Sequence, residues 1–195
     1  MCIRDSGQPP LLLLHGTGGN EDDLIPFGQA VAPGSALLSP RGQVLEAGMP
    51  RFFRRLAEGV FDEADLRRRA DDLATFVAEA RDRYGLPAPI ALGFSNGANI
   101  AAALLLLHPE TLAGAALLRA MEPLRTPPRP DLTGRNVLLL SGAMDPIVPA
   151  ENGRRLAATL AAAGAQVEHE TLPTGHGLSQ ADLTLTRRWM ARQGR

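Results

Sequence analysis

One serine, Ser95, stands in a setting that could make it a nucleophile. It is the centre of Gly93-Phe94-Ser95-Asn96-Gly97, a G-x-S-x-G pattern between a predicted strand and a predicted helix. Small residues on either side allow a sharp turn that lifts the serine hydroxyl above the edge of a sheet, where it can attack a carbonyl carbon. The same pentapeptide can arise by chance in a glycine-rich chain, so an ordinary strand-to-helix turn is the alternative at this point.

A serine hydroxyl is a weak nucleophile near neutral pH and needs a base, and the base needs a group that orients it. Two later residues suit these roles. Asp145 follows an apolar run that ends at Ser141, and His176 lies between two glycines after the last predicted strand. Taken singly, an aspartate before a proline is usually a helix cap and a lone histidine a surface or packing residue. The order Ser, Asp, His is that of α/β-hydrolases, and the carboxyl ends of strands are where parallel sheets place their sites. The sequence therefore predicts Ser95 as nucleophile, His176 as base and Asp145 as the acid that orients the base.

Acyl transfer to a serine also requires hydrogen-bond donors for the negative oxygen that develops in the transition state. We expect one donor to be the backbone N–H of Asn96, directly after the nucleophile. The second should come from the loop after the first strand, His15-Gly16-Thr17-Gly18-Gly19, where glycines allow a close approach of the main chain. We assign it to the N–H of Thr17. His15 lies too early in the chain for the base of this architecture, so we interpret it as structural.

The rest of the chain supplies the elements that must hold these residues in place. Short apolar runs bounded by Gly and Pro predict strands, and apolar residues at spacings of three and four predict helices. Strands are expected at 11–14, 36–39, 89–94, 112–118, 136–141 and 167–172, and helices at 66–84, 97–107, 151–163 and from 179 onward. This alternation predicts an α/β fold, a mostly parallel sheet with helices on both faces. We expect a single domain over residues 11–195, with residues 1–10 a non-native or disordered leader.

The composition excludes several classes of function. The net charge of −1 lacks the basic excess that favours binding to nucleic acid or to an anionic membrane surface. One cysteine cannot form an internal disulfide or a cysteine-rich zinc site. The longest apolar run, Ile100 to Leu107, is far shorter than the roughly 20 residues of a membrane span. We expect an enzyme for a small molecule, without metal or cofactor. The lack of an apolar signal segment predicts the cytoplasm, and homodimer formation is left open.

Four segments together resemble the phospholipase/carboxylesterase family of α/β-hydrolases, which includes acyl-protein thioesterases and small bacterial carboxylesterases. They are Leu-Leu-His-Gly-Thr-Gly-Gly-Asn-Glu, the Gly-Phe-Ser-Asn-Gly pentapeptide, Asp145-Pro146 and Gly175-His176. A further stretch, from Gly48-Met49-Pro50 to Phe61-Asp62, is similar to a bacterial branch linked to hydroquinone and catechol stress. The family normally has one or two strands before the His-Gly loop, so the resemblance implies that the N-terminal strands are truncated.

The resemblance implies a serine carboxylesterase that hydrolyses small carboxylic esters through an acyl-enzyme, with Ser95, Asp145 and His176 as its triad. A thioesterase or a lysophospholipase would use the same residues and stays an alternative. From a different class, a hydrolase-fold binding protein without catalysis is also open, although such proteins generally lack a triad member. A dienelactone hydrolase is disfavoured because that group usually has cysteine where this chain has Ser95.

By the same resemblance, the aromatic pair Phe52 and Phe53 corresponds to one that lies near the acyl pocket of thioesterase relatives. We expect one of the two rings to line the substrate pocket, with core packing of both as the alternative. Met144 and Leu178 adjoin the predicted acid and base and are expected to be apolar walls of this pocket. Three nearby arginines are interpreted as a solvated cluster, with binding of an acidic substrate group as the alternative: Arg51, Arg54 and Arg55.

Overall fold

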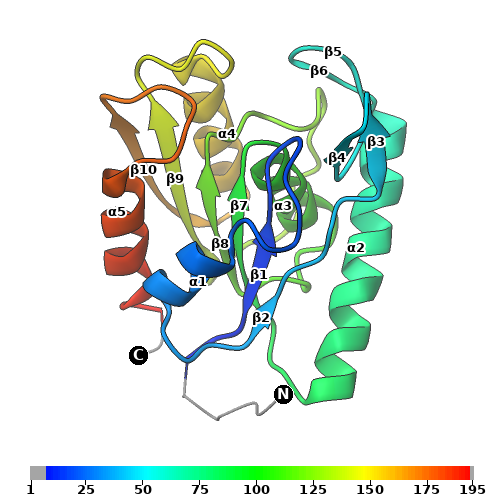
Figure 1. The fold of residues 1–195 in the computed structure, drawn as a ribbon, viewed down its shortest axis with the longest axis vertical. Coiled ribbons are helices and arrows are strands. Elements are labelled where there is room, and N and C mark those ends of the chain that lie inside the picture. Colours follow the sequence, from blue (N-terminus) through cyan, green and yellow to red (C-terminus); the bar gives the residue numbers. More distant parts are fainter. Residues whose placement is uncertain (1–7, 194–195) are drawn as a thin grey trace.

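The computed structural model describes residues 8–193, and these residues form a sheet between two layers of helices (Figure 1). The six strands of the main sheet are all parallel, in the order β10-β9-β8-β7-β1-β2. Their bounds are Leu11–Leu14 (β1), Leu37–Leu38 (β2), Ile90–Phe94 (β7), Gly114–Leu118 (β8), Asn136–Gly142 (β9) and Gln166–Leu172 (β10). The six predicted strands are confirmed, with ends that differ by about two residues or less.

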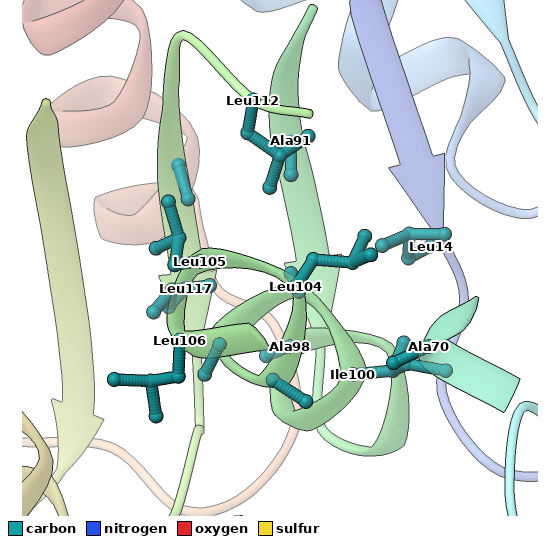
Figure 2. Packing of buried hydrophobic residues seen from close by; sticks show 14 of the residues in the cluster. Leu14, Ala70, Ala91, Ala98, Ile100, Leu104, Leu105, Leu106, Leu112 and Leu117 are labelled. Atoms are coloured by element: carbon teal, nitrogen blue, oxygen red, sulfur yellow. The ribbon is translucent and has the colours of Figure 1, made fainter. Parts of the chain in front are cut away.

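The central strands are apolar along their whole length because both of their faces are covered. All four leucines of β1 are buried, and they alternate between two cores. Leu12 and Leu14 join the core beneath α2, α3 and α4, and Leu11 and Leu13 join the core beneath α1 and α5. Figure 2 shows side chains of α3 packed in the first of these cores, together with Leu14.

The helices divide between the two faces of the sheet. One face carries α1 (Ile25–Val31) and α5 (Gln180–Met190), which pack against each other. The other carries α2 (Glu63–Tyr84), α3 (Asn96–Leu107) and α4 (Ala150–Ala162). The four predicted helices are confirmed. The seven-residue α1 was not predicted, because a short helix that contains a proline and a glycine has almost no periodic signal.

Two short hairpins between the second strand and α2 were also not predicted. They consist of β3 (Val44–Glu46) with β4 (Met49–Arg51), and of β5 (Arg55–Ala57) with β6 (Val60–Phe61). Figure 1 shows them at the end of the molecule where the strands of the main sheet have their carboxyl ends. The hairpins therefore lie close to the edge at which the site is expected.

The order of the strands reverses its direction between the neighbouring strands β1 and β7. The chain leaves β1 toward β2 on one side, whereas it leaves β7 toward β8 on the other. Open parallel sheets bind their ligands at such a switch point, because the two loops diverge and leave a crevice outside the carboxyl ends. The loop after β1 and the turn after β7 are the two segments in which the sequence places the oxyanion donors and the nucleophile.

The expected leader overlaps the fold at its last residue. Pro10 is buried, and its carbonyl oxygen accepts a hydrogen bond of 2.9 Å from the N–H of Ile90. Pro10 thus continues β1 and is part of the packed structure, while residues 1–7 lie outside the described residues. No helix within residues 8–193 combines the length and the apolar character needed to cross a membrane.

Candidate active site

Ser95, His176 and Asp145 come from three different strand ends and are joined by hydrogen bonds. The Nε2 atom of His176 lies 3.0 Å from the Oγ of Ser95, and its Nδ1 atom lies 2.8 Å from Oδ2 of Asp145. A carboxylate can only accept, so the Nδ1–H donates to Asp145 and Nε2 is free to accept the hydroxyl proton of Ser95. This is the arrangement that turns a serine into a nucleophile.

Ser95 sits in a backbone conformation that residues with a Cβ atom rarely adopt, with φ 52° and ψ −113°. The two glycines of the pentapeptide explain how this turn is accommodated. A Cβ atom at Gly93 would lie 2.7 Å from the backbone of Ala98, and one at Gly97 would collide with the carbonyl oxygen of Leu14. The turn therefore needs glycine at both positions, and it presents the serine between β7 and α3 at the switch point of the sheet.

Asp145 is held as a carboxylate by its surroundings. Its side chain has no exposed surface, and its Oδ1 accepts hydrogen bonds from the N–H groups of Ile147 (2.8 Å) and Val148 (2.9 Å). Burial acts to raise the pKa of Asp145. The hydrogen bonds from Val148, His176 and Ile147 outweigh it, so the pKa lies below the ordinary aspartate value. The acid is thereby kept charged and fixed toward the imidazole.

The two predicted oxyanion donors lie on segments that the structure brings together. Asn96 is the first residue of α3, so its N–H has no acceptor within the helix. Gly16, next to Thr17, approaches so closely to the ring before Ser95 that a Cβ atom would lie 2.8 Å from Phe94 Cδ1. No group among residues 8–193 accepts a hydrogen bond from the N–H of Thr17. Both N–H groups are therefore free to bind a substrate oxygen.

Arg51 supports the loop that carries Thr17, which the sequence did not indicate. It is 3% exposed, and its Nη1 donates a 2.7 Å hydrogen bond to Oγ1 of Thr17. Its Nε donates to the carbonyl of Phe53 (3.1 Å) and lies 3.3 Å from a carboxylate oxygen of Glu46. Burial lowers the pKa of Arg51, against the effect of Glu46. The structure thus corrects the interpretation of this residue as part of a solvated cluster.

The side chain of Asn96 and the ring of His15 bind the backbone on either side of Arg51, at Phe52 and Gly42. Oδ1 of Asn96 accepts a 2.7 Å hydrogen bond from the N–H of Phe52. Nε2 of His15 accepts one of 3.0 Å from the N–H of Gly42, and the two rings of His15 and Phe52 have centroids 4.7 Å apart. His15 therefore has structural contacts, as its early place in the chain suggested.

The predicted pocket residues fall into two groups. Phe52 and Phe53 are 5% and 0% exposed, and Phe53 packs edge-on against Phe61, which favours the alternative that both rings belong to the core. Met144 and Leu178 are exposed beside the predicted acid and base. Their position agrees with apolar walls next to the site, a role that stays a prediction.

Within the part of the chain that the structure describes, no group of three or more His, Cys, Asp and Glu side chains could hold a metal ion.

Known proteins similar to this chain share its fold. The model of the phospholipase/carboxylesterase family matches residues 1–191. The chain belongs to this family. It is 43% identical to a Bacillus cereus carboxylesterase of known structure, with a TM-score of 0.94 over 96% of this chain and 90% of that chain. It is 34% identical to a Mesorhizobium loti carboxylesterase of known structure, with a TM-score of 0.91 over 96% of this chain and 90% of that chain.

The family's sequence relatives include MhqD of Bacillus subtilis, which is named as a hydrolase. The two proteins are 45% identical over 181 residues, which cover 92% of this chain and 90% of MhqD. The predicted α/β-hydrolase fold and the resemblance to the phospholipase/carboxylesterase family are confirmed. Membership of this family supports a hydrolase.

Proposed function

We propose that this member of the phospholipase/carboxylesterase family is a cofactor-free serine carboxylesterase that hydrolyses small carboxylic esters through an acyl-enzyme. The observation that carries the proposal is the continuous hydrogen-bond network from Ser95 through His176 to Asp145. Each of the three residues is held by a different strand end of one sheet, so the network depends on the fold as a whole.

In the first half of the reaction, Nε2 of His176 takes the hydroxyl proton while Oγ of Ser95 bonds to the ester carbonyl carbon. The carbonyl oxygen becomes negative and is bound by the N–H groups of Thr17 and Asn96. The carbon–oxygen bond to the leaving alcohol then breaks, and His176 gives the proton to that alcohol. Asp145 stabilises the imidazolium that exists between these two steps.

In the second half, a water molecule attacks the acyl carbon of the acyl-enzyme. His176 takes the proton of the water and returns it to Oγ of Ser95 as the acyl bond breaks, which releases the carboxylic acid. The exposed apolar side chains of Met144 and Leu178 stand close in the chain to Asp145 and His176, respectively. They favour substrates with an apolar acyl or alcohol group.

The proposal is tested by labelling with a fluorophosphonate and by hydrolysis of p-nitrophenyl acetate and octanoate. Ser95→Ala should abolish labelling and lower turnover by roughly 10⁶-fold, as in comparable triads. Ser141→Ala is the matched control, because Ser141 also bonds a histidine, His169 at 3.0 Å, but lies inside the sheet with 2% exposure. It should keep both labelling and turnover.

A folded wild-type protein that neither labels nor hydrolyses any ester would refute the proposal and favour a binding protein on the same fold. A matching series of acyl thioesters, assayed beside the p-nitrophenyl esters, decides between esterase and thioesterase. We expect a higher kcat/KM for the esters.

A further inference from the structure

Arg119 is a charged residue without any exposed surface, and it has no role in the mechanism proposed for Ser95, His176 and Asp145. It follows directly after β8, and its backbone has φ 58°, a left-handed conformation that is uncommon for a residue with a Cβ atom. Its own N–H and its Nη1 both donate to the carbonyl of Leu140, at 2.8 and 3.2 Å. A conformation of this kind persists only where surrounding contacts over-determine it, so the contacts of the side chain are informative.

The guanidinium of Arg119 binds the loop that carries His176 on both sides of that residue. Nε donates to the carbonyl of Gly175 (3.0 Å), and Nη2 donates to the carbonyl of Gly177 (3.2 Å). Nη2 also donates to Oγ1 of Thr174 (3.0 Å). These three acceptors belong to a four-residue segment whose only titratable side chain is His176. The planar guanidinium has five N–H donors in a rigid fork, so it fixes the relative positions of its acceptors.

Asp182 fixes the guanidinium in turn. Its carboxylate accepts from Nη1 (2.8 Å) and Nη2 (2.9 Å) of Arg119 in a bidentate pair, and neither side chain has exposed surface. Oδ2 of Asp182 also accepts from the N–H and the hydroxyl of Ser179, the residue that caps α5. The loop of His176 is therefore tied to β8 and to the first turn of α5 by one buried pair.

A contribution to the stability of the fold does not by itself explain why Arg119 and Asp182 form a buried ion pair. Replacing a buried ion pair by apolar side chains of similar size is often neutral or stabilising, because two charges lose their hydration on burial. The geometry supplies a different reason, since the pair holds the backbone on either side of the one histidine that must face Ser95.

We propose that Arg119 and Asp182 are positioning residues that keep Nε2 of His176 within hydrogen-bond distance of Ser95. Neither touches the reacting atoms, and both act through the backbone of the histidine loop. The inference rests on the proposed function, because it assigns a task to a pair that would have none if His176 were not the base.

Two variants test whether the hydrogen bonds of Arg119 to the histidine loop, and not its charge alone, are needed for activity. Arg119→Lys keeps a cation opposite Asp182 but loses the fork that reaches Gly175 and Gly177. The double variant Arg119→Met with Asp182→Leu removes both charges and leaves no unpaired carboxylate in the interior. We expect each to fold and to lower kcat for p-nitrophenyl acetate by about 10²-fold, since a misplacement of about 1 Å can cost that much. KM should change by less than about twofold.

A second readout reports on His176 itself. The far-downfield proton signal of the Nδ1–H that bonds Asp145 should weaken or move in both variants, and fluorophosphonate labelling should slow in proportion to kcat. Arg135→Met is the matched control, because Arg135 is a partly buried arginine that binds a carbonyl, that of Pro109 at 3.2 Å, at the opposite end of the sheet. It should leave kcat, labelling rate and proton signal unchanged.

Wild-type kcat in either folded variant would overturn the inference. Failure of both variants to fold would overturn it as well, because the pair would then be a requirement of the fold and not of the site. Ser95→Ala, assayed in parallel, keeps the two proposals apart. If Ser95→Ala retains wild-type turnover, the proposed function falls; if it is inactive while the Arg119 variants keep full kcat, only the present inference falls.

Discussion

Ser95→Gly is expected to stabilise the protein relative to Ser95→Ala, although both variants should be inactive. The reason is the backbone of Ser95, whose φ of 52° and ψ of −113° lie outside the regions that residues with a Cβ atom favour. A residue held in such a region costs of order 1–3 kcal/mol. Glycine adopts positive φ without this cost.

The difference in stability between Ser95→Gly and Ser95→Ala measures the backbone strain at position 95. Both substitutions remove the hydroxyl and its contact with Nε2 of His176, so that contribution cancels between them. Glycine relieves about 1–3 kcal/mol of strain, and its greater freedom in the unfolded chain costs roughly 0.4–1 kcal/mol. The balance is about 1 kcal/mol in favour of glycine, which corresponds to a Tm higher by roughly 2–4 °C for a domain of this size.

The assay is thermal unfolding followed by far-ultraviolet circular dichroism, with urea unfolding as a second measure of stability. Ala78→Gly is the control, because Ala78 is exposed within α2 and has an ordinary helical backbone. It should lower stability by about 1 kcal/mol. The reasoning is refuted if Ser95→Gly unfolds at the same temperature as Ser95→Ala or below it while the control behaves as expected.

Three further predictions concern Arg51, Asp145 and Phe53. Arg51→Met should lower kcat by roughly 10- to 10²-fold, less than the 10²–10³-fold expected when one oxyanion donor is lost, because the N–H of Thr17 remains but loses its support; an unchanged kcat would argue against that support. Asp145→Asn should lower kcat by about 10⁴-fold, as in a comparable triad. Burial raises the pKa of Asp145, but hydrogen bonds from two backbone N–H groups and His176 hold it below its ordinary value. The carboxylate therefore adds stability above the unfolded-state pKa of about 3.9, and this contribution is lost as the pH falls through the lower folded value. The gap in urea midpoint between wild type and Asp145→Asn should shrink over that acidic range, and a gap independent of pH would contradict the assignment. Phe53→Ala should cost about 3–5 kcal/mol of unfolding free energy, because the ring is fully buried; intact stability with a raised KM would instead return the ring to the substrate pocket.

The sequence by itself determined the main elements, and it predicted three residues that the structure joins by hydrogen bonds. Strands such as β1 and β7 are short apolar runs closed by Gly or Pro, and α2 has an apolar stripe at helical spacing with Gly85 at its end. These signals are local, so they can be found without knowing what packs against them. The proposed triad could also be predicted, because each of its three residues follows a predicted strand and the carboxyl ends of parallel strands meet at one edge.

Only the tertiary structure decided which polar side chains hold the site. In the sequence, Arg51 and Arg119 stand beside apolar residues, but nothing in the sequence shows which polar groups they bind. The partner of Arg119 is Asp182, which lies 63 residues further along the chain, and Arg51 reaches Thr17 across 34 residues. The short strands β3 and β4 and the small α1 were missed for a related reason, since elements this short are stabilised by what they pack against. Burial and pairing are properties of groups that folding brings together, so they become visible only when the chain is folded.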